Sequence, residues 1–183
     1  MTLAFLWTSL ILLSFAGWGI AVTRLVRWEE SADLGIKISV GLALVVIMGG
    51  ILDATGAVGV GTVTAIVVTG CAIAAVAWAR GFAQLTADAG IASRKRSSVL
   101  LVVGLLALVL ARTVMRWSSF GFNAQDDYQA YMVFPQLMLD TGSSIDPFNG
   151  RRLMSGLGGQ SFLDSIVLAW LSFQNLRITD GVL

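Results

Sequence analysis

The amino-acid sequence predicts an all-α fold, a polytopic transmembrane helical bundle with one folded extracytoplasmic loop. Composition is the first reason, because 56% of the 183 residues are hydrophobic and only 13% are charged, about half the charged fraction of a soluble domain. The second reason is that the apolar residues form uninterrupted runs of roughly 20, the length that a helix needs to cross about 30 Å of hydrocarbon. The third reason is that polar and charged residues gather after residue 115.

Four apolar runs within residues 1–115 predict four transmembrane helices, at 3–22, 34–52, 58–79 and 98–115. We expect the first run to be a membrane span rather than a secretory signal, because basic residues follow it and none precedes it. The runs therefore predict a membrane protein whose N-terminal part consists of membrane-spanning helices, with the lipid bilayer as its first partner.

The positions of Lys and Arg predict the orientation of the bundle. The connections after the first and third runs are basic, whereas the turn 53–57 between the second and third runs has no basic residue. Because basic connections remain in the cytoplasm, we expect the N-terminus and residues 116–161 outside, in a bacterial inner (plasma) membrane. The basic residues of the two connections are Arg24, Arg27, Lys37, Arg80, Arg94, Lys95 and Arg96.

Other residues of the runs predict packing rather than chemistry. Cys71 lies inside the third run and is interpreted as a small apolar packing residue. Five tryptophans near the run ends are expected at headgroup level, and five glycines near the turn 53–57 are expected to let the second and third helices approach closely as an antiparallel hairpin. The tryptophans are Trp7, Trp18, Trp28, Trp78 and Trp117, and the glycines are Gly49, Gly50, Gly56, Gly59 and Gly61.

The composition also argues against several kinds of site. The chain has no histidine and one cysteine within an apolar run, which disfavours zinc, haem and copper. Carboxylates remain for acid–base chemistry and for hard cations such as Mg²⁺ or Mn²⁺. No basic cluster is large enough to predict binding of nucleic acid.

The loop 116–161 contains several aromatic residues, which disordered linkers lack, so we expect it to be folded. A helix should begin at the N-cap Asn123, with Asp126 in the capping-box position, and should stop at the glycine Gly142. Pro135 is expected to kink or interrupt this helix, which we expect to lie on the membrane. Its apolar face is expected to carry Tyr128, Tyr131, either Phe134 or Pro135, and Met138 at helical spacing.

Two pairs of charged residues in this loop are candidates for a functional site. Asp126 and Asp127 fall in the first turn of the predicted helix, where the helix dipole favours ionised carboxylates. Arg151 and Arg152 precede a glycine-rich stretch, and guanidinium groups beside such a backbone can bind phosphate. Two other interpretations stay open: the pairs could only cap a helix and neutralise each other, or the arginines could contact anionic lipid headgroups.

The final segment, 162–183, begins with a short apolar stretch. Ser161 and Asp164 have capping-box spacing and are expected to begin its helix. We expect either a fifth membrane helix or an interfacial helix here, because the apolar stretch is shorter than a full span. We also expect this helix to be truncated, because the sequence stops at Leu183 without a clear helix ending.

The loop resembles the first extracytoplasmic loop of the GT-C class of polytopic glycosyltransferases, which use polyprenyl-phosphate-linked sugars as donors. The stretch 123–131 (NAQDDYQAY) and the tract 142–152 (GSSIDPFNGRR) carry this resemblance over about 50 residues. In that class the acidic motif usually follows the first span, whereas three further helices precede it here. The class also has more spans than this chain, so the resemblance implies an N-terminal fragment.

The resemblance implies a role for each candidate residue. An acidic residue, Asp126 or Asp127, would deprotonate the acceptor hydroxyl or hold a divalent cation. Arg151 and Arg152 would neutralise the departing lipid-linked phosphate. The substrate-binding surface would also include two tyrosines of the same motif, Tyr128 and Tyr131.

Other functions remain open beside the glycosyltransferase. A polysaccharide polymerase, ligase or flippase-like protein is also polytopic and carries arginines in an outer loop, and a small accessory membrane subunit needs no site at all. A transporter or channel is disfavoured, because Asp53 is the one acidic residue near a span interior and falls in a turn.

Overall fold

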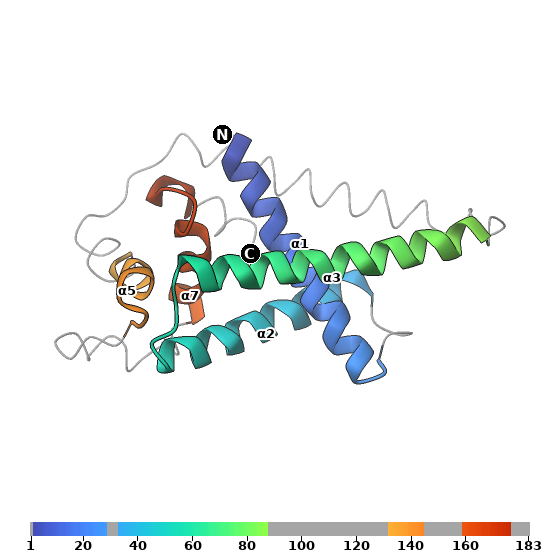
Figure 1. Ribbon diagram of the computed structural model, residues 1–183, viewed down its shortest axis with the longest axis horizontal. Coiled ribbons are helices and arrows are strands. Elements are labelled where there is room, and N and C mark those ends of the chain that lie inside the picture. The colour runs from blue at the N-terminus through green and yellow to red at the C-terminus, as the bar shows by residue number, and fades with distance from the viewer. Residues whose placement is uncertain (1, 29–32, 88–131, 145–158, 177–183) are drawn as a thin grey trace.

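The computed structural model describes residues 2–28, 33–87, 132–144 and 159–176, and every regular element in these ranges is helical. Three long helices form the body of the molecule (Figure 1): α1 (Thr2–Leu25), α2 (Leu34–Ala54) and α3 (Val60–Ala87). Two short helices, α5 (Val133–Thr141) and α7 (Gly159–Leu168), and the 3₁₀ helix η2 (Phe173–Asn175) complete the described part.

The three long helices are long and apolar enough to cross a membrane, over Leu3–Leu25, Leu34–Ala54 and Val60–Arg80. The first three predicted spans are thus confirmed as helices, with bounds within a few residues of those expected except where α3 continues to Ala87. The outward faces of these helices expose large apolar side chains, which suit a hydrocarbon surrounding. The predicted fourth span, 98–115, lies outside the described residues.

The body is held together by α1, which crosses both α2 and α3 (Figure 1). The crossing is close because glycines stand at the contact points: a Cβ added to Gly17 would collide with the backbone of Gly70, and one added to Gly41 would collide with that of Phe15. Small residues at such contacts let membrane helices gain dispersion energy along their backbones. The sequence predicts close approach at the glycines near the turn instead.

The turn between α2 and α3 is sharp, and the two helices diverge from it. Asp33 caps the start of α2, and its side chain accepts a hydrogen bond from the backbone N–H of Ile36 at 2.8 Å. At the turn, α2 ends at Ala54, and Gly56 follows in the left-handed region at φ 67°. From this turn α2 and α3 run in opposite directions, as expected, but each packs mainly on α1 (Figure 1). The hairpin is therefore splayed rather than closed.

The prediction that the glycines of the turn promote helix contact was wrong for most of them. A Cβ added to Gly50, Gly56, Gly59 or Gly61 would meet nothing within 4 Å. Gly49 is the exception, because its missing side chain makes room for the ring of Phe162 from α7.

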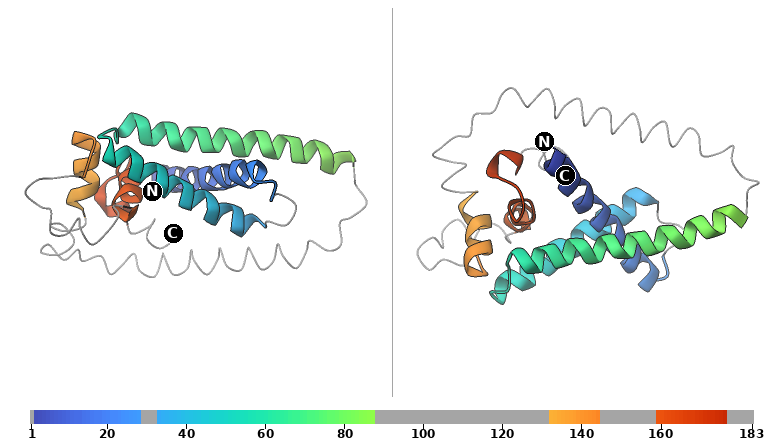
Figure 2. Two further views of the ribbon diagram at one scale, coloured as in Figure 1. Left: turned by 90° about the horizontal axis from the view of Figure 1, so that it is seen from below. Right: turned by 45° about the horizontal axis from the view of Figure 1, so that its top comes forward.

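The remaining described segments, 132–144 and 159–176, form what we call the cap layer. It lies at the end of the bundle where α2 ends and α3 begins, the turn end, and Figure 2 shows α5 and α7 side by side there. Both helices run across the long axes of α2 and α3 (Figures 1 and 2). With ten residues, α7 is about 15 Å long, half the thickness of the hydrocarbon core.

The ends of the cap-layer helices test three sequence predictions. Gly142 does end α5, with φ 91° and its N–H donating to the carbonyl of Met138, so the glycine stop is confirmed. Pro135 lies in the first turn of α5, where the missing N–H has no partner to lose. The described helix begins at Val133, which agrees with an interruption near Pro135, and the predicted start of the helix at Asn123 lies outside the described residues. The capping box at Ser161 is also wrong, since α7 begins two residues earlier, at Gly159.

Candidate functional site

The residues that the sequence singled out lie outside the described part of the chain. The structure therefore leaves their roles as predictions, and it describes the helices that follow them: α5 begins shortly after the acidic pair, and α7 begins shortly after the arginine pair. The residues concerned are Asp126, Asp127, Tyr128, Tyr131, Arg151 and Arg152.

The turn end of the bundle is organised around the carboxylate of Asp53, in the last turn of α2. Its Oδ1 accepts hydrogen bonds from the backbone N–H of Ser144 and from the hydroxyl of Ser143, the latter at 3.1 Å. Its Oδ2 accepts from the hydroxyl of Ser144 at 2.7 Å. Because hydrogen bonds to an ionised group are roughly twice as strong as neutral ones, Asp53 ties the end of α5 to the end of α2. We call this contact the Asp53 clamp.

A backbone contact supports the Asp53 clamp. The N–H of Val58, in the turn, donates to the carbonyl of Gly142 at 3.0 Å. A Cβ added to Gly142 would collide with the backbone of Gly56, so the two left-handed glycines are in direct contact. Glycine is required at position 142 both by its φ of 91° and by this approach.

The other cap helix, α7, is inserted between the long helices. The indole N–H of Trp7 in α1 donates to the carbonyl of Ile166 at 2.9 Å, and that of Trp170 donates to the hydroxyl of Thr64 in α3 at 2.8 Å. The start of α7, at Gly159, lies against Val46, about 12 Å along α2 from its end at Ala54. The cap layer therefore reaches well into the span of the bundle.

Two of the five tryptophans do not have the headgroup role that the sequence analysis assigned to them. Trp7 is buried and holds α7. Trp18 is half-buried beside α3 and donates its indole N–H to the carbonyl of Ile66 at 3.1 Å. Trp28 and Trp78 are exposed, at 48% and 61%, and their location at headgroup level stays a prediction. Trp117 lies outside the described residues.

No protein-family model, curated protein or solved structure matches this chain. The resemblance to GT-C glycosyltransferases therefore rests on the sequence motifs of the loop alone.

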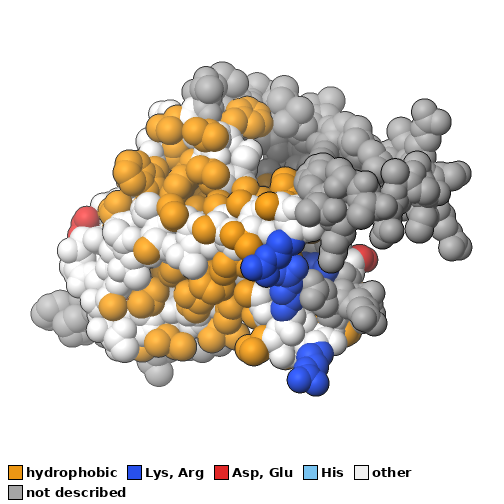
Figure 3. Space-filling model, turned by 45° about the vertical axis from the view of Figure 1, so that its right-hand side comes forward, with side chains coloured by type: hydrophobic (Ala, Val, Ile, Leu, Met, Phe, Trp, Pro, Cys, Tyr) orange, Lys and Arg blue, Asp and Glu red, His pale blue; other side chains and the backbone are white. Residues whose placement is uncertain are grey.

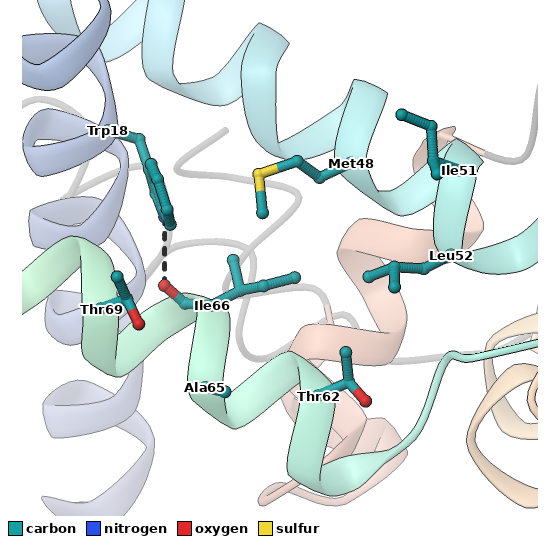
Figure 4. Close-up of a pocket in the computed structure, with 8 residues that line it drawn as sticks. All are labelled: Trp18, Met48, Ile51, Leu52, Thr62, Ala65, Ile66 and Thr69. Atoms are coloured by element: carbon teal, nitrogen blue, oxygen red, sulfur yellow. Dashed lines mark hydrogen bonds between the residues drawn. The ribbon is translucent and has the colours of Figure 1, made fainter.

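A groove with an apolar lining opens between α2 and α3 where they diverge (Figure 4). Its volume is about 340 Å³. Met48 and Leu52 of α2 face Thr62 and Ala65 of α3 across it, and Trp18 and Ile66 stand beside it, joined by their hydrogen bond. Apart from threonine hydroxyls, the lining offers nothing to a polar ligand.

The described basic residues lie at one end of the bundle, together with the acidic Asp33 at the start of α2, and the other described aspartates lie at the turn end and in the cap layer. All four described Lys and Arg residues lie at the end opposite the turn, which we call the basic end. Figure 3 shows basic side chains on one side of the molecule, next to hydrophobic patches. The turn end and cap layer carry Asp53, Asp140 and Asp164 among the described residues. The basic residues are Arg24, Arg27, Lys37 and Arg80.

The structure thus identifies two features that the sequence analysis missed: the Asp53 clamp and the groove. The sequence predicts Asp53 in the turn 53–57, whereas it lies in the last turn of α2. Its hydrogen-bond partners were not predicted, because they lie about 90 positions away in the chain. The one sequence feature that could have singled out Asp53 is that this carboxylate lies beside an apolar run with no basic residue nearby. Within the described residues, no three acidic or cysteine side chains lie close enough to hold a metal ion.

Proposed function

We propose that this chain forms the N-terminal part of a membrane glycosyltransferase that moves a sugar from a polyprenyl-phosphate carrier to an envelope glycan or lipid acceptor. The observation that supports it is the packing of α5 against α7 at the turn end. The acidic pair precedes α5 in the sequence, and the arginine pair precedes α7. Two segments that are distant in sequence are therefore tethered to one end of the bundle.

Chain length limits how far the proposed catalytic residues can be from this end. Asp127 precedes Val133 by six positions and Arg152 precedes Gly159 by seven, so each is within roughly 20–25 Å of a cap-layer helix even along a fully extended chain. The length of the chain therefore allows both pairs to reach the turn end. The bilayer beside it would hold the hydrocarbon tail of the carrier.

The reaction proposed for this site is a displacement at the anomeric carbon of the donor sugar. The carboxylate of Asp126 or Asp127 accepts the proton of the acceptor hydroxyl, whose oxygen forms the new glycosidic bond. The bond from the sugar to the carrier phosphate breaks, and the guanidinium groups of Arg151 and Arg152 stabilise the charge that develops on the phosphate. A divalent cation held by the aspartates would assist the same departure.

The site should lie at the outer face of the membrane. The described Lys and Arg residues lie at the basic end, and basic ends remain in the cytoplasm. This supports an outer location for the turn end, the cap layer and the N-terminus, and it agrees with donors presented at the extracytoplasmic face of an inner membrane.

Turnover of a polyprenyl-phosphate sugar by membranes containing the protein tests this proposal. We expect Asp126→Asn or Asp127→Asn to reduce turnover at least 100-fold, the size of a typical general-base contribution. The matched control is Asp140→Asn, because Asp140 is exposed on α5 and pairs with Gln136. If both variants turn over donor as fast as the Asp140→Asn control, the acidic pair is not catalytic and the proposal fails.

A further inference from the structure

The end of α1 contains a residue in an uncommon backbone conformation. Arg27 has φ 57°, in the left-handed region, and among the described residues other than glycine no second one lies there. Its N–H donates to the carbonyl of Arg24 at 3.1 Å, and the N–H of Trp28 donates to the carbonyl of Thr23 at 2.8 Å. These hydrogen bonds form a Schellman motif, whose left-handed position is usually glycine because a Cβ is unfavourable there. An arginine at this position therefore carries a conformational cost that glycine would avoid.

The surroundings of Arg27 are apolar and exposed. Leu25, Val26 and Trp28 are all exposed, Leu25 at 84%, so the arginine stands among large hydrophobic side chains that the protein leaves uncovered. Exposed apolar, indole and basic groups in one place are typical of the membrane–water interface, where an indole ring settles at headgroup level and an arginine reaches the headgroups from an apolar surface. The end of α1 therefore suits contact with lipid headgroups.

The charge of the basic end favours an anionic lipid over a neutral one. Within the described part of the chain no carboxylate pairs with Arg27, and Asp33, the acidic residue described at this end, caps α2 instead. The segments 23–37 and 80–97, which join or continue the helices of this end, contain seven Lys and Arg residues and four Asp and Glu residues. A surface with an excess of positive charge attracts anionic headgroups, and a guanidinium group binds phosphate through two parallel hydrogen bonds.

We propose that Arg27 binds the phosphate of an anionic phospholipid, in the leaflet that adjoins the basic end. The guanidinium group pairs with the phosphate, the exposed side chains of Leu25 and Trp28 contact the acyl chains, and this binding offsets the conformational cost of the arginine. A glycine at position 27 would relax the end of α1 but would leave no charge for the phosphate. The site lies at the end of the bundle opposite the proposed glycosyltransferase site and is independent of it.

Lipid binding to the purified protein in mild detergent tests the proposal. Native mass spectrometry measures the affinity for added phosphatidylglycerol, and phosphatidylcholine, whose phosphate is neutralised by an ammonium group, gives the background. We expect the wild type to prefer phosphatidylglycerol. In Arg27→Gly the affinity for phosphatidylglycerol should fall about fivefold, the contribution of one basic residue near an anionic membrane surface, and the affinity for phosphatidylcholine should not change.

The same variant has an opposite effect on stability, which distinguishes lost binding from lost folding. Without added lipid, Arg27→Gly should unfold at a higher temperature than the wild type, because glycine adopts the left-handed conformation without strain. Arg27→Lys keeps both the charge and the strained backbone, so it should keep the preference for phosphatidylglycerol and the unfolding midpoint of the wild type. A lower midpoint for Arg27→Gly would show that the arginine is not strained and would contradict the argument for the site.

Arg80→Gln is the matched control, because Arg80 is an exposed arginine of the same end, on α3. It removes one positive charge and leaves the end of α1 unchanged, so it should reduce the affinity for phosphatidylglycerol less than Arg27→Gly does. Three binding results overturn the proposal: equal affinity of the wild type for both lipids, unchanged affinity for phosphatidylglycerol in Arg27→Gly, or the same loss in Arg80→Gln as in Arg27→Gly, which would indicate a diffuse effect of charge.

Discussion

The body of the bundle and the cap layer are held by different kinds of contact. Where α1 crosses α2 and α3, the helices meet backbone to backbone at Gly17, Gly41 and Gly70. The cap layer is instead attached through directed hydrogen bonds, to the carboxylate of Asp53 and from the indole of Trp7. The first kind of contact depends on the absence of side chains and the second on particular polar groups.

This difference predicts that the two regions respond to different substitutions. Adding a methyl group to a helix crossing must move two backbones, which affects the whole bundle. Removing a hydrogen-bond acceptor at the turn end should release the cap layer and leave the crossings intact. A substitution in one region that destabilises both regions equally would contradict this difference.

The largest effect is expected from Gly41→Ala. Its Cβ would collide with the backbone of Phe15 in α1, and such overpacking costs about 1–3 kcal/mol or more. Gly50→Ala is the matched control on the same helix, since its Cβ meets nothing within 4 Å, and it should be neutral or stabilising by up to about 1 kcal/mol. Thermal unfolding in detergent measures both, and equal midpoints for the two variants would contradict the crossing described above.

A more local effect, on the cap layer rather than on the whole bundle, is expected from Asp53→Ala. The substitution removes the acceptor of three hydrogen bonds from Ser143 and Ser144, and loss of bonds to a charged group costs about 1.5–3 kcal/mol. Hydrogen exchange should become faster in residues 132–144 and remain unchanged in α1. Asp53→Asn, which keeps one acceptor oxygen, should fall between the wild type and Asp53→Ala.

The control for the Asp53 clamp is Asp140→Ala, which removes an exposed carboxylate from α5 itself. Its partner is the neighbouring side chain of Gln136 at 3.0 Å, within the same helix. Exchange in residues 132–144 should stay close to that of the wild type. If Asp140→Ala accelerates exchange as much as Asp53→Ala, the cap layer is not held by the clamp.

The smallest effect is expected at the tryptophans that hold α7. Trp7→Phe removes a buried hydrogen bond to the carbonyl of Ile166, worth about 1 kcal/mol. Trp170→Phe removes a bond to Thr64 from an indole that is 53% exposed, so water replaces it and the loss should be smaller. Hydrogen exchange in α7 measures both effects, and a larger effect of Trp170→Phe than of Trp7→Phe would contradict the expected order.

Local sequence patterns predicted the body of the fold well and the contacts poorly. The apolar runs predicted α1, α2 and α3, because the length and hydropathy of a span are properties of one segment. Gly142 was recognised as a helix stop for the same reason. The glycines of the crossings were missed because their partners are in other helices, and so was Asp53, whose partners lie beyond the third and fourth predicted spans.

The candidate site shows the same division. Residue types and spacing in the loop led to Asp126, Asp127, Arg151 and Arg152, and the structure describes the helices that follow these pairs rather than the pairs themselves. That α5 and α7 pack together could not be predicted, because the sequence between them has no regular pattern. The insertion of α7 between α2 and α3 depends on Gly49 accommodating Phe162, a non-local fit.

The location of the turn end is the claim on which the proposed function depends, and cysteine labelling tests it most directly. Cys71 is the single cysteine, so Cys71→Ser gives a background without thiols. In this background one cysteine replaces the exposed Ala57 in the turn, and another replaces Leu25, which is 84% exposed at the end of α1. In intact cells, a membrane-impermeant maleimide should label Ala57→Cys at once and Leu25→Cys only after lysis. Labelling in the opposite order would place the cap layer in the cytoplasm and contradict the account.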